Sequence, residues 1–342
     1  MKASGRLRIG LSCVALALGG LSTGAPASRD PHHIIALREL VPAADPLRAH
    51  ALLFDARFAQ AAAEYLGSPK ETTVPFLARL PATEHLLAHA RQFDYAVAKD
   101  SGEALVRELL ARVAGRREAI LESIAYFMGP MLDDPRWISD ALRYLPADFR
   151  FHGDLFLVAG YDIGVALAPH ASLNAAHRHF EGHPRELLYY AIHELHHVGF
   201  MTYSRPPGIA DLRTCADVLH LIDYSTALEG MAVLAARDRR MREHAMADDE
   251  DYVALADEKR MEQDEARYFQ EYDALRRRGV DAADKDALAV IERMSGGERL
   301  WYRVGARMAA RLEQALGRST MVTLVTHKPE RLVPTYRQIV GR

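Results

Sequence analysis

One stretch of the sequence decides the fold: residues 185–201 read RELLYYAIHELHHVGFM. Pro184 stands just before it, in a position that suits the first residue of a helix, and the Ser-Arg-Pro-Pro-Gly segment at 204–208 breaks the pattern. Between these two signals the stretch is largely apolar. It therefore predicts a single helix over 185–201.

Residues 193–197 of this helix match the pattern His-Glu-x-x-His. Residues four apart share a helix face, so His193 and His197 can present imidazole nitrogens to one metal ion about 2.0–2.1 Å away. Glu194 lies beside them, and its carboxylate can take a proton from a metal-bound water and pass it to a leaving group. A His193/His196 pair could also bind a metal, but only His197 leaves Glu194 in the general-base position. We expect His196 to support the ligands or to line the substrate cleft.

A third ligand is expected on a neighbouring element, because a catalytic zinc ion usually takes three protein ligands and one water. Glu229 is the best candidate, since small and apolar residues surround it in a predicted helix over 225–240 that Ser225 can cap. An acid in such surroundings needs a partner. The alternative is a Glu229 side chain that reaches solvent or pairs with Arg213 or Arg237.

This order of residues resembles the gluzincin zinc peptidases. More narrowly, a His-Glu-x-His-His helix followed by Glu-Gly-x-Ala, here beginning at Glu229, is similar to a little-characterised bacterial family of zinc-dependent peptidases. The later motif Tyr302-x-x-Gly305 belongs to the same resemblance, which covers roughly 150–340. The resemblance implies one zinc ion per chain with three ligands and a general base: His193, His197, Glu229 and Glu194.

The sequence departs from two related patterns. The thermolysin-like pattern has an Asp four residues after the third ligand, where this chain has Val233, so Asp223 or Asp217 would have to support a zinc-bound histidine. The metzincin pattern needs a third His at position 203, which is Tyr203 here. We therefore exclude the metzincin branch.

Short strands are predicted before the central helix. Residues 151–158 and 162–167 have the composition of strands and are separated by Gly160. Residues 171–175 are expected to form the edge strand that pairs with an extended peptide substrate. These strands predict a small mixed sheet packed on the helix 185–201.

The rest of the chain is predicted to be helical. Between residues 28 and 148, apolar residues recur at helical spacing, and Asp100 and Glu103 can form a capping box. Residues 248–278 are rich in charge and predict a solvated helical segment. A last amphipathic helix is expected to end at Gly317, with apolar residues four apart at Leu300, Val304, Met308 and Leu312.

These elements predict a mainly α, α+β fold that the resemblance identifies as zincin-like. We expect a signal peptide at 1–27, a helical N-terminal region at 28–148 and a catalytic region at 149–342. The signal has a positive start, an apolar stretch and the small-residue cleavage site Ala25-Pro26-Ala27. It predicts export to the periplasm or the medium, with no stable membrane span after cleavage.

Peptide hydrolysis also needs a donor to the developing oxyanion, and several side chains qualify. The candidates are Tyr203, Tyr224, Tyr302 and His220. Four histidines crowd the loop before the central helix, and they are either an accessory metal site or ordinary polar residues: His170, His177, His179 and His183.

Composition and the remaining motifs narrow the function. The chain has 342 residues and a formal net charge of -3, and loss of the three positive charges of the signal takes this to -6. Such a surface is not suited to nucleic acid. Cys215 would be the only cysteine left, so no intrachain disulfide can form, and it has no sign of a catalytic thiol. The sequence favours an exported zinc peptidase acting on peptides or proteins; the alternatives are a non-catalytic zinc- or partner-binding protein and a structural histidine helix.

Overall fold

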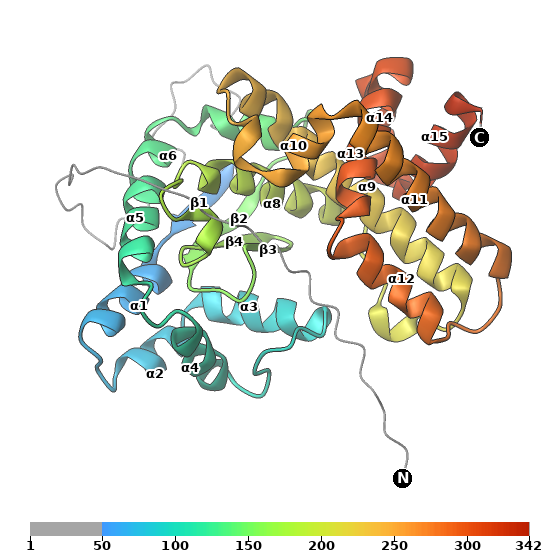
Figure 1. Ribbon diagram of the computed structural model, residues 1–342. Coiled ribbons are helices and arrows are strands. Elements are labelled where there is room, and N and C mark those ends of the chain that lie inside the picture. The colour runs from blue at the N-terminus through green and yellow to red at the C-terminus, as the bar shows by residue number, and fades with distance from the viewer. Residues whose placement is uncertain (1–49, 342) are drawn as a thin grey trace, which may run out of the picture.

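The computed structural model describes residues 50–341, and at their centre lies a four-stranded mixed sheet (Figure 1). Its strands are β1 (Ala51–Asp55), β2 (His152–Val158), β3 (Gly164–Leu167) and β4 (His170–Asn174). Their order is β1-β2-β4-β3. β2 runs parallel to both β1 and β4, whereas β3 is antiparallel to β4 and forms one edge. In Figure 1 the sheet lies between α3 and α8.

Two of the four strands differ from prediction. The predicted edge strand at 171–175 is wrong, because β4 pairs with β2 on one side and β3 on the other. β3 is the edge strand instead. β1 falls in the region predicted to be helical, since its pairing with β2 joins segments about 100 residues apart, beyond the reach of local patterns. The boundary at 148/149 stays a prediction, and the sheet draws strands from both sides of it.

Short helices follow β1 and pack beside the sheet. They are α1 (Arg57–Gly67), α2 (Thr73–Ala78), α3 (Pro81–Gln92), α4 (Gly102–Arg112), α5 (Arg117–Met128), α6 (Pro130–Asp133) and α7 (Ile138–Ala141). The hydroxyl of Ser101, rather than the predicted Asp100, caps α4 by accepting from the Ala104 N–H. The predicted signal at 1–27 lies outside the described residues.

Two long helices, α8 (Glu186–Tyr203) and α9 (Cys215–Arg242), form the middle of the molecule. The sequence predicted α8 to within two residues at its C-terminal end. α9 is one continuous helix that begins with a Thr214–Asp217 capping box, so Ser225 is not a cap but a buried residue inside the helix. α9 is long and apolar enough to cross a membrane, but 78% of its apolar window is buried within the protein, as expected for a core helix.

The C-terminal helices gather around α9 (Figure 1). They are α10 (Glu250–Ala256), α11 (Glu258–Arg278), α12 (Lys285–Ser295), α13 (Leu300–Leu316), α14 (Arg318–His327) and α15 (Leu332–Val340). α13 ends at Gly317, which has a φ of 82°. The prediction of a solvated segment at 248–278 is wrong in part, because Met261, Tyr268 and Phe269 of α11 are buried. The described fold is mainly helical with a small mixed sheet, which confirms the predicted fold class.

Candidate metal centre

The antiparallel packing of α8 on α9 brings distant residues together. At one end, the Tyr189 hydroxyl of α8 donates to Glu243, the residue that follows α9, at 2.5 Å. At the other end, the Tyr224 hydroxyl of α9 donates to the Ser204 carbonyl that follows α8, at 2.7 Å. Glu229 lies between these two tethers and therefore faces the middle of α8.

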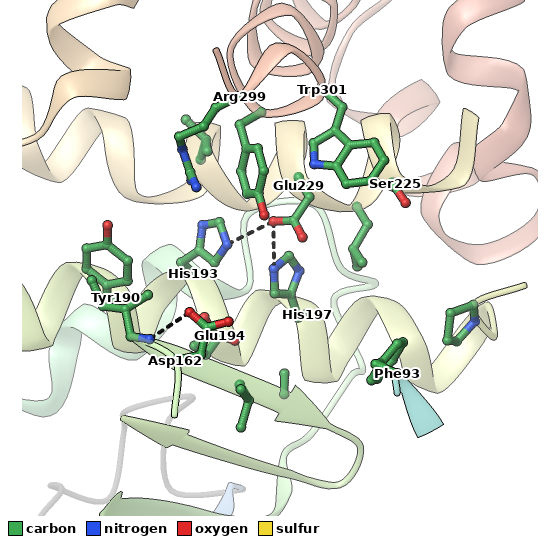
Figure 2. Close-up of a pocket in the computed structure, with 18 of the residues that line it drawn as sticks. Phe93, Asp162, Tyr190, His193, Glu194, His197, Ser225, Glu229, Arg299 and Trp301 are labelled. Atoms are coloured by element: carbon green, nitrogen blue, oxygen red, sulfur yellow. Dashed lines mark hydrogen bonds and ion pairs between the residues drawn. The ribbon is translucent and has the colours of Figure 1, made fainter. Parts of the chain in front are cut away.

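Three side chains converge at this point. The Nε2 atoms of His193 and His197 each lie 3.1 Å from the same Oε2 atom of Glu229 (Figure 2). The candidate ligand atoms of the three residues all lie within 4.8 Å of one another. A tetrahedral zinc ion with ligands about 2.0–2.1 Å away holds them roughly 3.3 Å apart, so small adjustments of these side chains would admit the ion. Two imidazoles and one carboxylate are also a donor set that zinc prefers.

Charge explains why these groups stay together without an ion. Burial by itself would raise the pKa of Glu229, but the imidazoles of His197 and His193 outweigh it and hold the pKa below its ordinary value. Burial would likewise lower the pKa of His197, yet Glu229 more than offsets this, so the pKa is raised. A carboxylate therefore stands in this apolar site as an anion, ready to accept a cation.

Glu194 lies beside the ligands on the sheet side of α8, next to Asp162 (Figure 2). A Cβ atom added at Gly164 of β3 would come within 2.6 Å of the Glu194 Oε1 atom, so this edge strand runs directly against the carboxylate. Burial raises the pKa of Glu194 to about 8; the charge of His197 opposes this shift, and the charges of Glu229 and Asp162 add to it. Without an ion, Glu194 holds a proton at neutral pH.

A cavity extends from the three ligands in both directions along α8 and α9. Towards the C-terminal end of α8 its walls are apolar and include Met201, Leu221, Leu228 and Trp301. Towards the N-terminal end they carry charge, with Arg240, Asp249, Asp251 and Arg299. The candidate metal centre thus lies where an apolar half and a charged half of one cleft meet.

A family model described as a putative zinc dependent peptidase, DUF5700, matches residues 95–341. The chain belongs to this family. The match spans well over half of the chain and includes α8, α9 and α13, so it confirms the resemblance drawn from the motifs. No curated protein and no solved structure matches the chain.

Within this DUF5700 chain, the four candidates for oxyanion donor separate clearly. Tyr203 and His220 are exposed and do not line the cavity. Tyr224 lines the cavity, but its hydroxyl already donates a hydrogen bond to the Ser204 carbonyl oxygen. Tyr302 also lines it, is 6% exposed and lies under the Arg299 guanidinium, which is 3.7 Å from its ring centroid.

Other predictions about this centre are corrected. His196 neither supports a ligand nor lines the cleft: it is fully buried against Tyr144, and neither ring nitrogen has a hydrogen-bond partner among the described residues. Burial holds the pKa of His196 well below its ordinary value, so the ring is neutral. The partners of Glu229 are the two imidazoles rather than Arg213 or Arg237.

The two proposed supporting acids also have other roles. Asp223 accepts a hydrogen bond from the Tyr272 hydroxyl at 2.9 Å, and Asp217 belongs to the cap of α9. The Nδ1 atom of His197 is buried and lacks a partner within the described part of the chain. Neither acid therefore replaces the Asp of the thermolysin-like pattern as the partner of a candidate zinc-binding histidine.

The loop histidines do not converge on one site. His170 pairs with Asp154 at 2.9 Å, whereas His179 lies 2.8 Å from Glu186. The geometry around His179, Glu186 and Asp249 could hold a metal, but the buried Arg240 already supplies a cation there, with its Nη2 atom 2.5 Å from Glu186. We interpret this group as a buried ion-pair network.

Sequence reasoning missed Asp162 and Tyr95. The Tyr95 hydroxyl donates to the Asp162 Oδ2 atom at 2.7 Å, and burial raises the pKa of Asp162 to about 7. Both side chains line the cleft beside Glu194. The only signal in the sequence was the Asp162-Ile163-Gly164 run, which we assigned to a strand.

Proposed function

We propose that the protein is an exported monozinc metallopeptidase, with His193, His197 and Glu229 as the zinc ligands and Glu194 as the general base. The observation that carries the proposal is the convergence of two histidine nitrogens on one carboxylate that is 12% exposed, with a second carboxylate beside them. Membership of the DUF5700 family supports the same conclusion.

When bound, zinc would lower the pKa of a water molecule and polarise the scissile carbonyl. Glu194 then takes the proton from the attacking water and delivers it to the leaving amine. For this it must be ionised, and a nearby dication opposes the burial that raises its pKa. Asp162 accepts a hydrogen bond from the Tyr95 hydroxyl and borders the same space. It can therefore orient Glu194 when Glu194 donates the proton.

The substrate is proposed to be a peptide that lies along β3. β3 is an edge strand, the kind of strand that can pair with an extended chain. Gly164, Val165 and Ala166 of this strand line the cleft. Tyr302 of α13 lines the same cleft, and its hydroxyl is our choice for the donor to the oxyanion.

Metal content and turnover of a small set of variants test this proposal. Wild type and Glu194→Gln are expected to hold about one zinc per chain, whereas His197→Ala and Glu229→Ala lose it. Glu194→Gln abolishes peptide cleavage, and Tyr302→Phe lowers kcat by roughly 100-fold with zinc retained. The measurements are mass spectrometry of bound metal and cleavage of a peptide library.

His220→Ala is the matched control, because His220 is an exposed histidine of α9, the helix that carries Glu229, and lies outside the cleft. It should keep both zinc and activity. Full activity of Glu194→Gln would refute the general base. Zinc that is bound by wild type, together with no cleavage of any peptide, would favour the non-catalytic zinc-binding alternative.

We also propose that residues 1–27 are removed during export. The positive start, apolar stretch and Ala25-Pro26-Ala27 site carry this proposal. Mass spectrometry of the protein from a cell fractionation is expected to find an N-terminus at Ser28 outside the cytoplasm. Intact chains starting at Met1 in the cytoplasmic fraction would contradict export.

A further inference from the structure

α3 carries a histidine from one face of the sheet into the cleft. His85 lies against the interior strands, with its ring centroid 5.6 Å from that of Phe156 in β2 and 6.1 Å from that of His170 in β4. His89 follows one helical turn later, on the same face of α3, and lines the cavity that holds the candidate metal centre. Phe93, at the end of α3, also lines it, and Figure 2 shows this ring on the sheet side of α8. The end of α3 therefore forms part of the cleft wall.

A chain of hydrogen bonds fixes which nitrogen of His89 carries a proton. The Tyr161 hydroxyl lies 3.0 Å from the Leu86 carbonyl oxygen and 2.9 Å from the Nδ1 atom of His89. A carbonyl oxygen can only accept, so the single proton of the Tyr161 hydroxyl is donated to Leu86. The Tyr161 oxygen then accepts from His89, which places a proton on Nδ1. Burial lowers the pKa of His89 to about 3, and the charges of His85 and His197 add to this shift, so the ring is neutral and Nε2 carries no proton.

The Nε2 atom of His89 is therefore an acceptor, and no group within the described residues donates to it. The unpartnered nitrogens of His85 and His196 are sealed from solvent, whereas Nε2 of His89 keeps accessible surface. The two nitrogens of an imidazole point in nearly opposite directions. Because Nδ1 faces Tyr161, which does not line the cavity, Nε2 faces the cleft.

Aromatic rings surround this acceptor. The ring centroid of His89 lies 4.6 Å from that of Phe93 and 5.3 Å from that of Tyr95, and both residues line the cavity. Such rings pack well against a planar ring of a ligand. The acid on this wall, Asp162, already accepts from the Tyr95 hydroxyl at 2.7 Å and from the Ile163 N–H at 2.8 Å. The wall thus offers aromatic rings and one neutral acceptor, which suit a neutral aromatic donor better than a cation.

We propose that His89 forms a specificity subsite for a tyrosine side chain of the substrate. The rings of Phe93 and Tyr95 pack on the phenol ring, and the phenol hydroxyl donates to Nε2 of His89. A phenylalanine would fill the same space but leave Nε2 without a donor, so it binds more weakly. Serine and threonine carry a hydroxyl but leave the two rings uncovered. This inference rests on the proposed peptidase function, and it names the side chain that the site selects.

Cleavage of matched peptides tests the preference. Each peptide carries Tyr at a single position, and its partner carries Phe there. At one position, wild type should cleave the Tyr peptide about 10-fold more efficiently than the Phe peptide, because one hydrogen bond to a neutral acceptor contributes a factor of this order. At the other positions the two peptides should be cleaved equally. Peptides with Lys or Arg at the selective position should be cleaved less efficiently than the Tyr peptide.

Two variants separate the acceptor from the packing. His89→Phe keeps a ring and removes Nε2, so the advantage of Tyr over Phe should disappear. Tyr161→Phe changes no residue of the cleft wall but removes the acceptor of the Nδ1 proton, which can then move to Nε2; the advantage should fall about 3-fold. This second variant keeps the test decisive if His89→Phe is poorly folded. Tyr65→Phe, in α1 and outside the cleft, is the matched control and should keep the full preference.

Two readouts need no catalysis. Calorimetry with the zinc-loaded Glu194→Gln variant should find about 10-fold tighter binding of the Tyr peptide than of the Phe peptide, and the difference should vanish when His89→Phe is added. NMR of the imidazole nitrogens, with His89 assigned by its absence in His89→Phe, should find the proton on Nδ1 in wild type. In Tyr161→Phe, part of the population should carry it on Nε2.

The outcomes separate the two proposals. Three results would overturn the subsite and leave the peptidase function standing: equal cleavage and binding of Tyr and Phe peptides at every position, a preference for Lys or Arg, or a proton on Nε2 of His89 in wild type. Selective binding of Tyr peptides that depends on His89, with no cleavage by zinc-loaded wild type, would support the subsite and refute the peptidase.

Discussion

Gly164 leaves the space that the Glu194 carboxylate occupies. A Cβ at this position would lie 2.6 Å from Oε1, 2.8 Å from Cγ and 2.9 Å from Cδ of Glu194. Neither the strand nor the buried carboxylate can move away easily, because β3 is held by β4 and packs against α8. An Ala at 164 would therefore push the Glu194 carboxylate away from His193, His197 and Glu229.

We expect Gly164→Ala to lower kcat/KM by about 100-fold, since a displacement near 1 Å of a catalytic group costs a factor of that order. Zinc content should not change. Steady-state kinetics and metal analysis measure both. Gly67→Ala is the control, because its Cβ would meet only the flexible Arg117 side chain. Normal kinetics in Gly164→Ala would show that the strand does not position Glu194.

At the scale of helices, contact between α9 and α13 depends on two glycines. A Cβ at Gly230 would lie 2.2 Å from the Gly305 carbonyl carbon, and one at Gly305 would lie 2.4 Å from the Thr226 carbonyl oxygen. The obstacles are backbone atoms, so only separation of the helices could relieve the clash. This explains why Glu-Gly and Tyr-x-x-Gly occur together: the glycine next to Glu229 meets the glycine one turn after Tyr302.

We predict that Gly230→Ala lowers the free energy of unfolding by about 2–3 kcal/mol and weakens zinc binding, because overpacking would shift Glu229. Urea unfolding and zinc titration would measure these effects. Gln314→Ala, at an exposed position of α13, should stay within about 0.5 kcal/mol of wild type. A Gly230→Ala variant as stable as this control would contradict the close contact.

On the scale of the whole molecule, the buried acids make the metal-free protein sensitive to pH. Burial raises the pKa of Glu194 to about 8 and that of Asp162 to about 7. In the unfolded chain both carboxyls ionise near pH 4, so the folded protein binds these protons more tightly. Their contribution to stability is complete below about pH 4 and is lost as the pH rises through the folded values.

Between pH 5 and 8, the free energy of unfolding of metal-free wild type should therefore fall by about 5–6 kcal/mol more than that of the double variant Glu194→Gln, Asp162→Asn. Urea unfolding in the presence of a chelator, repeated at several pH values, provides the comparison. Parallel pH profiles of the two proteins would mean that these carboxyls are not buried as described.

The sequence by itself determined the features that depend on local spacing. A helix repeats every 3.6 residues, so the His193/His197 pair, the neighbouring Glu194 and the amphipathic helix ending at Gly317 could all be predicted from nearby residues. Glu229 was found because an isolated acid in an apolar helix needs a partner. The structure brings these residues together; that they hold zinc stays a proposal.

Tertiary structure alone decided the features that depend on contacts distant in the sequence. β1 forms only by pairing with β2, and β4 is interior only because β2 and β3 flank it. Trp301 and Asp162 reach the cleft from segments outside α8, and no local pattern distinguishes them from ordinary core residues. His196 shares a helix turn with His193 and His197 yet is buried in the core, because successive residues of a helix face different directions.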